Sequence, residues 1–275
     1  MKDVWKICFV CLMSFCLCGC TLSRTQKEEL PKLVIGGTNY SPYFFQNMDG
    51  KYEGIDVDIA AEACKRMGYA PVFQEVELEE RFQLLEEGKV DCLWSCLNIE
   101  SSEAVLWTEP YLYTQRVVVV PESSKMQTLE DLKGKKVAVL SGSSSENIVI
   151  NGLNPNFPEI KQLVSYNSLE NAFMAMRKNY VDAVIGHESS MMVYTEEYEN
   201  QYRYLHVSLR SEALGVAFAK EKDSAVMEKM NHVIEEMRED GTMKAIIQKY
   251  GLDVEKNLNG GINNEKAEEK QGMGN

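Results

Sequence analysis

The chain has 275 residues, 44% of them hydrophobic, and a formal net charge of −13 at neutral pH. This charge disfavours a nucleic-acid partner, because phosphates require a basic protein face. It also disfavours peripheral binding to anionic lipid, so any membrane attachment should be covalent. The length and the hydrophobic content suffice for the cores of two lobes of ordinary domain size.

The N-terminus has the order of features found in secretion signals. Lys2 and Lys6 form a short basic region, and an apolar run follows at 7–17. A membrane-spanning helix needs about 20 apolar residues, so this run is too short to be one. It fits the core of a signal peptide.

The end of this segment, Leu-Cys-Gly-Cys at 17–20, resembles a lipobox. We therefore expect residues 1–20 to be a lipoprotein signal peptide and Cys20 to be the lipid-attachment residue. The polar residues 21–29 are then a tether. An ordinary signal peptide cleaved nearby and an uncleaved anchor are the two alternatives.

Five of the eight cysteines lie in the predicted signal segment, which leaves Cys64, Cys92 and Cys96. Cys92 and Cys96 are separated by roughly 13 Å along a predicted strand, too far for a disulfide between them. The mature chain has no Cys-x-x-Cys pair and only three histidines. We expect free, largely buried thiols, with no disulfide framework, zinc site or cofactor.

Helices and strands alternate from residue 33 onward, as in α/β proteins. The apolar patterns predict strands at 33–37, 72–76, 90–97, 136–140, 163–166, 181–185 and 214–219, and a long apolar segment lies at 117–120. Helices are predicted from 56, at 80–87, from 144, at 168–178, at 226–237 and at 243–250. Polar residues dominate from 253 onward, so 253–275 is predicted to be a disordered tail.

A loop crowded with aromatic side chains follows the first predicted strand: Tyr40, Tyr43, Phe44 and Phe45. In an open α/β sheet, ligands bind at the carboxyl ends of strands. Proline restricts the residue before it, so the Ser-Pro pair at 41–42 makes this loop rigid. We expect Tyr40 to contact a ligand, the alternative being that it packs on its own lobe. Tyr43 and Phe44 are expected in the core.

Five segments, in order, resemble the polar amino-acid family of extracytoplasmic solute-binding proteins, which are the receptors of ABC importers. The segments are 33–68, 88–111 (GKVDCLW…WTEPY), 129–145 (LEDLKGKKVAVLSGSSS), 179–183 (NYVDA) and 214–251 (LGVAFAKE…DGTMKAIIQKYG). The resemblance therefore covers most of the chain, from 33 to 251. It implies an α/β fold of the two-lobed, type II periplasmic-binding-protein-like kind, with a ligand cleft between the lobes.

The resemblance also implies how the chain divides between the lobes. The first lobe comprises 30–116 and 211–252, and the second lobe, 117–210, is inserted between them. The chain would cross between the lobes at 117–121 and again at 208–214. Two crossings make a hinge, so the cleft would close by rotation of one lobe against the other.

A serine-rich loop precedes the predicted helix at 144. Ser143 and Glu146 have the spacing of a capping box, and the N–H groups of a helix start also attract anions. Capping alone is the alternative. In the family this loop binds the ligand carboxylate, which implies Ser141, Ser143 and Ser144 as ligand-binding residues.

The segment 95–98 ends a predicted strand at the place where the family's ligand amine meets backbone carbonyls and a hydroxyl. The resemblance implies Cys96 and Asn98 as contacts, because the Asn98 amide can both donate and accept in place of the hydroxyl. A merely structural role for this segment is the alternative.

Three positions depart from the family pattern. The family's arginine, which clamps the α-carboxylate, has no counterpart in 100–104, and Ser102 stands in that region. The family's aspartate for the α-amino group is matched by His187, or by Glu188 if the register shifts by one residue. Leu78 stands where many relatives have a second stacking aromatic.

These departures bear on the ligand. Arg81 and Arg116 are the nearest arginines in sequence, and we expect them to be solvated surface charges rather than a replacement clamp. Each lost charge-assisted hydrogen bond removes about 1.5–3 kcal/mol. We therefore expect weak or no binding of the standard amino acids, and a ligand that lacks one of the two α-charges.

No hydrolase, metalloprotease or phosphate-binding motif is present. Cys96 and His187 could be imagined as a nucleophile and its base, but a buried cysteine beside a ligand-contacting histidine is more ordinary. We therefore expect that the protein is not an enzyme. We expect a monomeric lipoprotein that delivers a small polar solute, either an amino acid or an amino-acid-like compound, to an ABC import permease. A sensor lipoprotein signalling to a membrane receptor, and a dehydratase-type enzyme using His187 or Glu188, are the alternatives.

Overall fold

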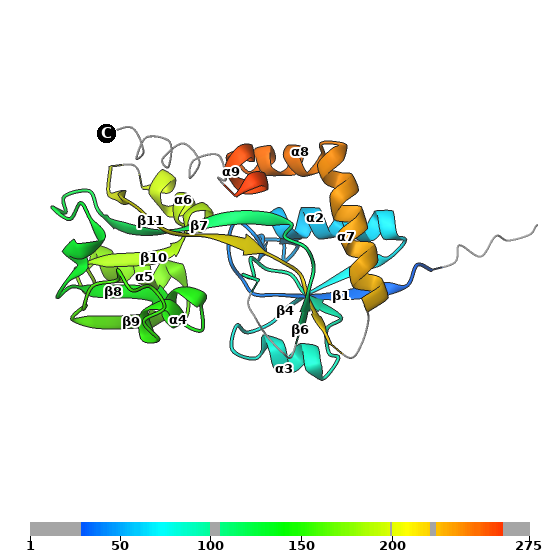
Figure 1. Cartoon of the computed structure of the whole chain (residues 1–275), viewed down its shortest axis with the longest axis horizontal. Coiled ribbons are helices and arrows are strands. Elements are labelled where there is room, and N and C mark those ends of the chain that lie inside the picture. The colour runs from blue at the N-terminus through cyan, green and yellow to red at the C-terminus, as the bar shows by residue number, and fades with distance from the viewer. Residues whose placement is uncertain (1–28, 100–104, 199, 221–223, 261–275) are drawn as a thin grey trace, which may run out of the picture. The chain divides into compact units, whose positions relative to one another are not determined.

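The computed structural model describes residues 29–99, 105–198, 200–220 and 224–260 (Figure 1). All elements below belong to one compact unit that begins at Pro31. The predictions for the signal peptide, Cys20 and Ser102 lie outside the described residues, as does the end of the tail. No helix within the described ranges is long and apolar enough to cross a membrane.

The first sheet has five strands in the order β4-β1-β5-β12-β6. These strands are β1 (Lys32–Gly37), β4 (Ala70–Glu75), β5 (Cys92–Leu93), β6 (Val105–Trp107) and β12 (Ala217–Ala219). β1 is parallel to both β4 and β5, whereas β12 is antiparallel to its two neighbours. A small hairpin of β2 (Phe45–Gln46) and β3 (Tyr52–Glu53) follows β1.

Helices cover both faces of the first sheet. They are α2 (Ile55–Met67), α3 (Arg81–Glu86), α7 (Ser224–Glu239), α8 (Thr242–Lys249) and α9 (Val254–Asn259). Helices α2, α7 and α8 bury their apolar stripes with Leu33 and Ile35 of β1 in one core, and Figure 1 shows these three helices together. Leu85 of α3 belongs to the core on the other face.

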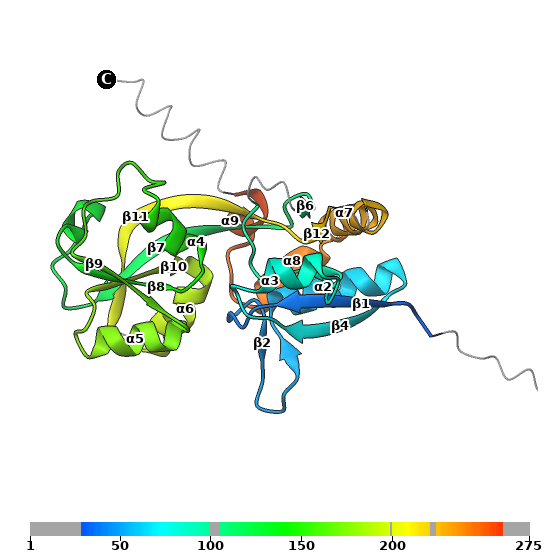
Figure 2. The same cartoon turned by 90° about the horizontal axis from the view of Figure 1, so that it is seen from below.

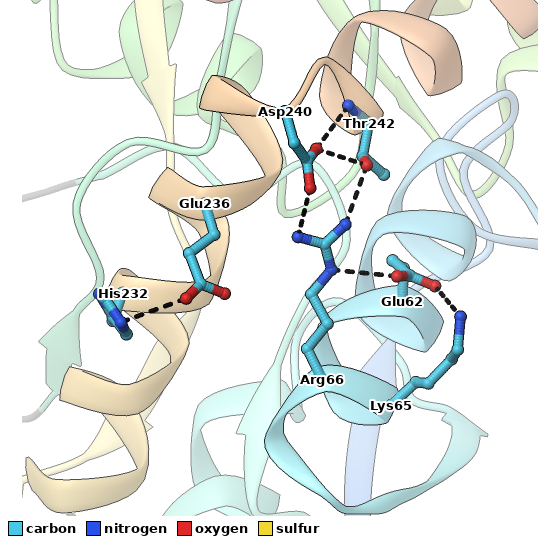
Figure 3. A network of polar contacts seen from close by, with 7 residues as sticks. All are labelled: Glu62, Lys65, Arg66, His232, Glu236, Asp240 and Thr242. Atoms are coloured by element: carbon cyan, nitrogen blue, oxygen red, sulfur yellow. Dashed lines mark hydrogen bonds and ion pairs between the residues drawn. The ribbon is translucent and has the colours of Figure 1, made fainter.

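A polar network joins the helices α2, α7 and α8 at the surface (Figure 3). The Arg66 guanidinium bonds Glu62 Oε1 at 3.0 Å, Asp240 Oδ2 at 2.7 Å and Thr242 Oγ1 at 2.9 Å. The Asp240 and Glu62 side chains are 47% and 26% exposed. Exposed ion pairs of this kind contribute little to stability.

The second sheet has the order β11-β7-β10-β8-β9. Its strands are β7 (Leu112–Pro121), β8 (Lys136–Leu140), β9 (Gln162–Tyr166), β10 (Ala183–His187) and β11 (Tyr202–Leu214). β8 is parallel to β9 and β10, and β7 is antiparallel to β10 and β11. The associated helices are η1 (Leu129–Leu132), α4 (Ser144–Ile150), α5 (Leu169–Arg177) and α6 (Glu188–Glu197).

The valine run of β7 explains why this sheet is covered on both faces. Val117 and Val119 join a core with α5 and α6, which lie side by side in Figure 2, whereas Val118 and Val120 join the core on the opposite face. A strand buried on both faces has a continuous apolar run instead of an alternating one.

The long strands β7 and β11 pair along most of their length, from Leu112 with Leu214 to Pro121 with Tyr202. Both predicted crossing segments, 117–121 and 208–214, lie within these two strands. Past its pairing with β7, the chain continues from Leu214 to β12 of the first sheet. The residue bounds of the two predicted lobes stay a prediction.

The predicted α/β alternation is confirmed, as are the burial of Tyr43 and Phe44 and the free, buried state of the three cysteines. The strand predicted at 90–97 is wrong in length. Only Cys92 and Leu93 pair as β5, because Cys96 adopts a positive φ of 50° that leaves the extended conformation.

The disordered tail predicted from 253 is wrong for its first residues, which form α9. The Asp253 side chain caps this helix by accepting from the Lys256 N–H at 2.9 Å. Val254 and Leu258 pack against the core of the first sheet, and Asn257 is buried. Two apolar residues at a helical spacing therefore order a segment whose composition is polar.

Candidate functional site

A cavity of about 360 Å³ lies at the carboxyl ends of four strands. Thr38 and Tyr40 follow β1, and the segment 95–98 follows β5. From the second sheet come the residues 142–147, which follow β8, and 185–187, which end β10. Strand ends of both sheets therefore form its wall, as expected for a ligand site in α/β proteins.

The structure brings most of the predicted ligand-binding residues to this cavity. Those that line it are Tyr40, Leu78, Cys96, Asn98, Ser143, Ser144 and His187. Ser141 lies beside it, and its hydroxyl donates to Glu79 Oε1 at 3.1 Å. Glu188 does not join the group. Its carboxylate accepts from Lys256 Nζ at 2.6 Å and lines a second cavity of about 440 Å³.

Tyr40 lies between the first-sheet core and the second sheet. Its ring stacks on Tyr43 at 6.2 Å between centroids and meets His187 edge-on at 5.9 Å. The backbone N–H of His187 points to the Tyr40 hydroxyl at 3.5 Å. Burial raises the pKa of Tyr40, so its phenol stays neutral. The ring is thus both a wall of the cavity and a contact between the two sheets.

His187, the last residue of β10, is buried in a polar cluster. Its Nδ1 is 2.7 Å from Cys96 Sγ, and its Nε2 is 3.2 Å from Glu212 Oε2. Burial lowers the pKa of His187, which favours a neutral imidazole at neutral pH. Although burial opposes it, the hydrogen bond from His187 and the charge of Arg116 hold the pKa of Glu212 below its ordinary value.

Arg116 contradicts the expectation of a solvated surface charge. It pairs with His187 in the β7–β10 ladder, and its side chain is 0% exposed. Its Nη2 donates to Glu212 Oε2 at 2.5 Å and to Ser144 Oγ at 2.6 Å. A buried guanidinium requires such a partner, and Glu212 is distant in sequence. Local sequence therefore gave no signal for the pair.

Arg81 is half-buried and lines the same cavity. Its guanidinium donates to the Leu78 carbonyl and lies 4.7 Å from the centre of the Phe82 ring. It is thus a cation at the wall of the cavity, which the expectation of a solvated surface position did not anticipate.

The start of α4 is capped as its sequence predicts. Ser143 Oγ accepts from the Glu146 N–H at 3.3 Å. The Glu146 carboxylate accepts from the Gly142 N–H at 2.6 Å, which is one residue earlier than in a standard capping box. Next to the cap, Ser144 Oγ accepts from Asn98 Nδ2 at 2.5 Å, which joins the strand ends of the two sheets.

Sequence reasoning missed Asp56, which stands in the first turn of α2. Its side chain is 1% exposed, and its Oδ2 accepts from the Cys96 N–H at 2.7 Å. This bond holds Cys96 in its left-handed conformation at the cavity wall. In sequence, Asp56 resembles any acidic residue that complements a helix dipole. Burial raises the pKa of its carboxyl to about 7.

Asp56 predicts a pH dependence of stability with a defined sign. Folding raises its pKa from 3.8 to about 7, so the folded state keeps this proton to a higher pH than the unfolded state. The stabilising contribution is complete below the unfolded pKa and is lost as the pH rises through the folded pKa.

We expect Asp56→Asn, whose amide oxygen can still accept from Cys96, to remove this decrease of unfolding free energy between pH values of about 4 and 7. Urea unfolding of both proteins across this interval measures it. Parallel pH profiles for the wild type and the variant would contradict the assignment.

A family model and a protein of known type both match most of this chain. The model of the bacterial extracellular solute-binding proteins, family 3, matches residues 33–253. The chain is 30% identical over 233 residues to the histidine-binding periplasmic protein of Escherichia coli (strain K12), covering 80% of this chain and 88% of that protein.

Two solved structures have the same fold. A substrate-binding protein of an ABC uptake transporter from Streptococcus pneumoniae, with bound histidine, superposes with a TM-score of 0.74 at 26% identity, covering 81% of this chain and 94% of that one. An ancestral arginine-binding protein bound to arginine gives 0.71 at 28% identity, covering 80% and 97%. The predicted fold class, an α/β protein of the type II periplasmic-binding kind, is confirmed.

Proposed function

The chain belongs to the bacterial extracellular solute-binding proteins, family 3, and we propose that it binds a small amino-acid or amino-acid-like solute and delivers it to an ABC import permease. The family is one of extracellular proteins, so the chain works outside the cytoplasm. The solute would occupy the cavity of about 360 Å³, a volume within the usual range for small-ligand sites.

The cross-sheet contacts around the cavity carry this proposal. Asn98 bonds Ser144 at 2.5 Å, Cys96 contacts His187 at 2.7 Å, and Tyr43 bonds Ser189 at 2.5 Å. The first residue of each pair is attached to the first sheet and the second residue to the second sheet. Rotation of the sheets about β7 and β11 would make or break all three contacts together. Such a set of contacts suits closure of two lobes around a solute.

A thermal-shift screen of the purified mature protein against a broad metabolite panel tests the proposal. A solute that binds the folded state raises the melting temperature by mass action. The proposal expects a concentration-dependent rise for at least one amino-acid-like compound. A panel that contains the amino acids and their derivatives and raises the melting temperature with none of them would refute it.

The relatives compared above are binding proteins, and we propose that this chain likewise releases its solute unchanged. Incubating each thermal-shift hit with the protein, and then quantifying it by mass spectrometry, separates this role from the dehydratase alternative. If the protein stimulates ATP hydrolysis by a reconstituted permease, import is favoured over sensing. Consumption of the solute would favour the enzyme.

We also propose that Cys20 carries a lipid anchor, with the permease as the membrane partner. We expect Cys20→Ala to release the mature protein into the medium or to leave an unprocessed precursor, because the apolar run at 7–17 is too short to anchor the chain by itself. Cell fractionation and electrophoretic mobility measure both outcomes. Unchanged retention and mobility would contradict the lipobox.

A further inference from the structure

The hydrogen-bonding capacity of His187 is fully used by protein groups. Nε2 lies 3.2 Å from Glu212 Oε2, which can only accept, and 3.2 Å from Arg116 Nη2, whose two protons go to Glu212 and Ser144, so Nε2 carries the ring proton. Nδ1 is then an acceptor, and Cys96 Sγ lies 2.7 Å from it. Burial raises the pKa of the Cys96 thiol, so the thiol keeps its proton and donates it to Nδ1. The imidazole has no acceptor left for a solute.

The hydroxyl of Ser144, in contrast to the His187 ring, keeps a proton that it can donate to a solute. Its oxygen accepts from Asn98 Nδ2 at 2.5 Å and from Arg116 Nη2 at 2.6 Å. A hydroxyl oxygen has two acceptor positions and one proton, so these bonds fill its acceptor capacity and leave the proton to be donated. The guanidinium charge of Arg116 polarises the hydroxyl and strengthens it as a donor. Ser144 lines the cavity, where its proton can meet an acceptor of the solute.

The nearby carboxylates are also occupied. Glu146, the one acidic side chain that lines the cavity among the described residues, accepts from the Gly142 N–H at 2.6 Å and from the Ser165 hydroxyl. Glu212 is held by Arg116, as described above. An ammonium group in this cavity would therefore meet no unoccupied carboxylate of the described residues, only the neutral amide oxygen Oδ1 of Asn98, whereas a carboxylate would meet an unused donor.

Apolar side chains line the outer part of the cavity. They are Leu78 from the loop after β4, Phe82 from α3, where it follows Arg81, and Ile150 from α4. Phe82 and Ile150 are 38% and 65% exposed, so they mark the side of the cavity that is open to solvent. Apolar surface of this kind is covered most favourably by an apolar group of the solute. This apolar surface offers no carboxylate that could pair with a cationic side chain of a solute.

We propose that the preferred solute is a small carboxylic acid with an apolar body and without an α-ammonium group, such as the 2-oxo acid of an apolar amino acid. Its carboxylate accepts the Ser144 proton, and its body covers Leu78, Phe82 and Ile150. The inference rests on the proposed binding function and assigns its solute class.

Calorimetry with matched pairs tests the inference on the unaltered protein. The pairs are leucine with 4-methyl-2-oxopentanoate and phenylalanine with phenylpyruvate, and arginine and histidine are titrated beside them. The oxo acid of at least one pair should bind about tenfold or more tightly than its amino acid, which corresponds to about 1.4 kcal/mol. Arginine and histidine should bind more weakly than that oxo acid.

An amino acid that binds as tightly as its oxo acid, or tight binding of arginine or histidine, would overturn the inference and leave the binding function standing. Failure of both oxo acids beside a thermal-shift hit of another class would do the same. If no compound of the panel binds, the binding function itself fails, so the two failures are distinguishable.

A pair of serine variants tests the donor. Ser144→Ala should weaken binding of the oxo acid by about tenfold or more, because a charged acceptor loses its hydrogen bond. Ser124→Ala is the control, since its hydroxyl accepts from the Met126 N–H and does not line the cavity, and it should change the affinity by less than about threefold. Equal affinities of the two variants would show that Ser144 is not the donor.

Discussion

Replacing Arg116 by glutamine is expected to lower the free energy of unfolding by about 3–5 kcal/mol. The guanidinium is 0% exposed, and it is the cation that pairs with the buried carboxylate of Glu212. Without it, Glu212 must either remain charged without a cation in a nearly buried site or take up a proton, and both lower the free energy of unfolding. Its remaining partner, His187, is a neutral ring. The loss should appear as a lower urea midpoint and as loss of solute binding.

Two controls separate the buried charge from general damage. Arg66→Gln removes the arginine of the network in Figure 3, whose partner Asp240 is 47% exposed, and it should lower the free energy of unfolding much less than Arg116→Gln. The double replacement Arg116→Met with Glu212→Met should recover much of the loss, because it removes both buried charges. Equal midpoints for Arg116→Gln and Arg66→Gln would contradict the buried pair.

Replacing Gly54 by alanine is expected to destabilise the protein by about 3 kcal/mol or more. Gly54 adopts φ +134°, and an added Cβ would lie 2.0 Å from the Tyr43 carbonyl oxygen. That carbonyl accepts from the Asp56 N–H at 3.0 Å, which fixes the loop that carries Tyr40 onto α2. The clash is with backbone, so no side chain can move away to relieve it.

Gly50→Ala is the matched control for this prediction. Gly50 also has a positive φ, +74°, but an added Cβ would have no atom within 4 Å. Gly50→Ala should therefore lower the free energy of unfolding only by the conformational strain, about 1 kcal/mol. Comparison of the two urea midpoints isolates the steric clash. A Gly54 variant as stable as the Gly50 variant would show that the loop can move away from α2.

Much of the fold follows from local patterns. The strand at 136–140 and the helix from 144 are both observed where they are predicted, because a buried apolar run is followed, three residues after its end, by the capping residue Ser143. Only the last residue of β11, Leu214, lies in a predicted strand. The rest of β11 is not predicted, since it contains charged and polar residues with no alternating pattern. Its strand conformation comes from pairing with β7, which precedes it by some eighty residues.

The same distinction explains the candidate site. Most of the proposed ligand contacts follow from the family resemblance together with the predicted strand ends. The cluster of Arg116, His187 and Glu212 could not be predicted, because it depends on the pairing of β7 with β10 and β11. Arg116 and Glu212 are ordinary in their own segments, and His187 stands out only as a departure from the family pattern. Only the ladder converts them into one buried hydrogen-bond network.

The central claim is that a solute is held between the strand ends of the two sheets. Hydrogen exchange followed by mass spectrometry, with and without the strongest thermal-shift hit, tests it most directly. Solute should slow exchange in segments 95–98 and 142–147 together, since they face one cavity from different sheets. Protection of only one of these segments, or protection confined to residues 251–257 at the second cavity, would contradict the claim.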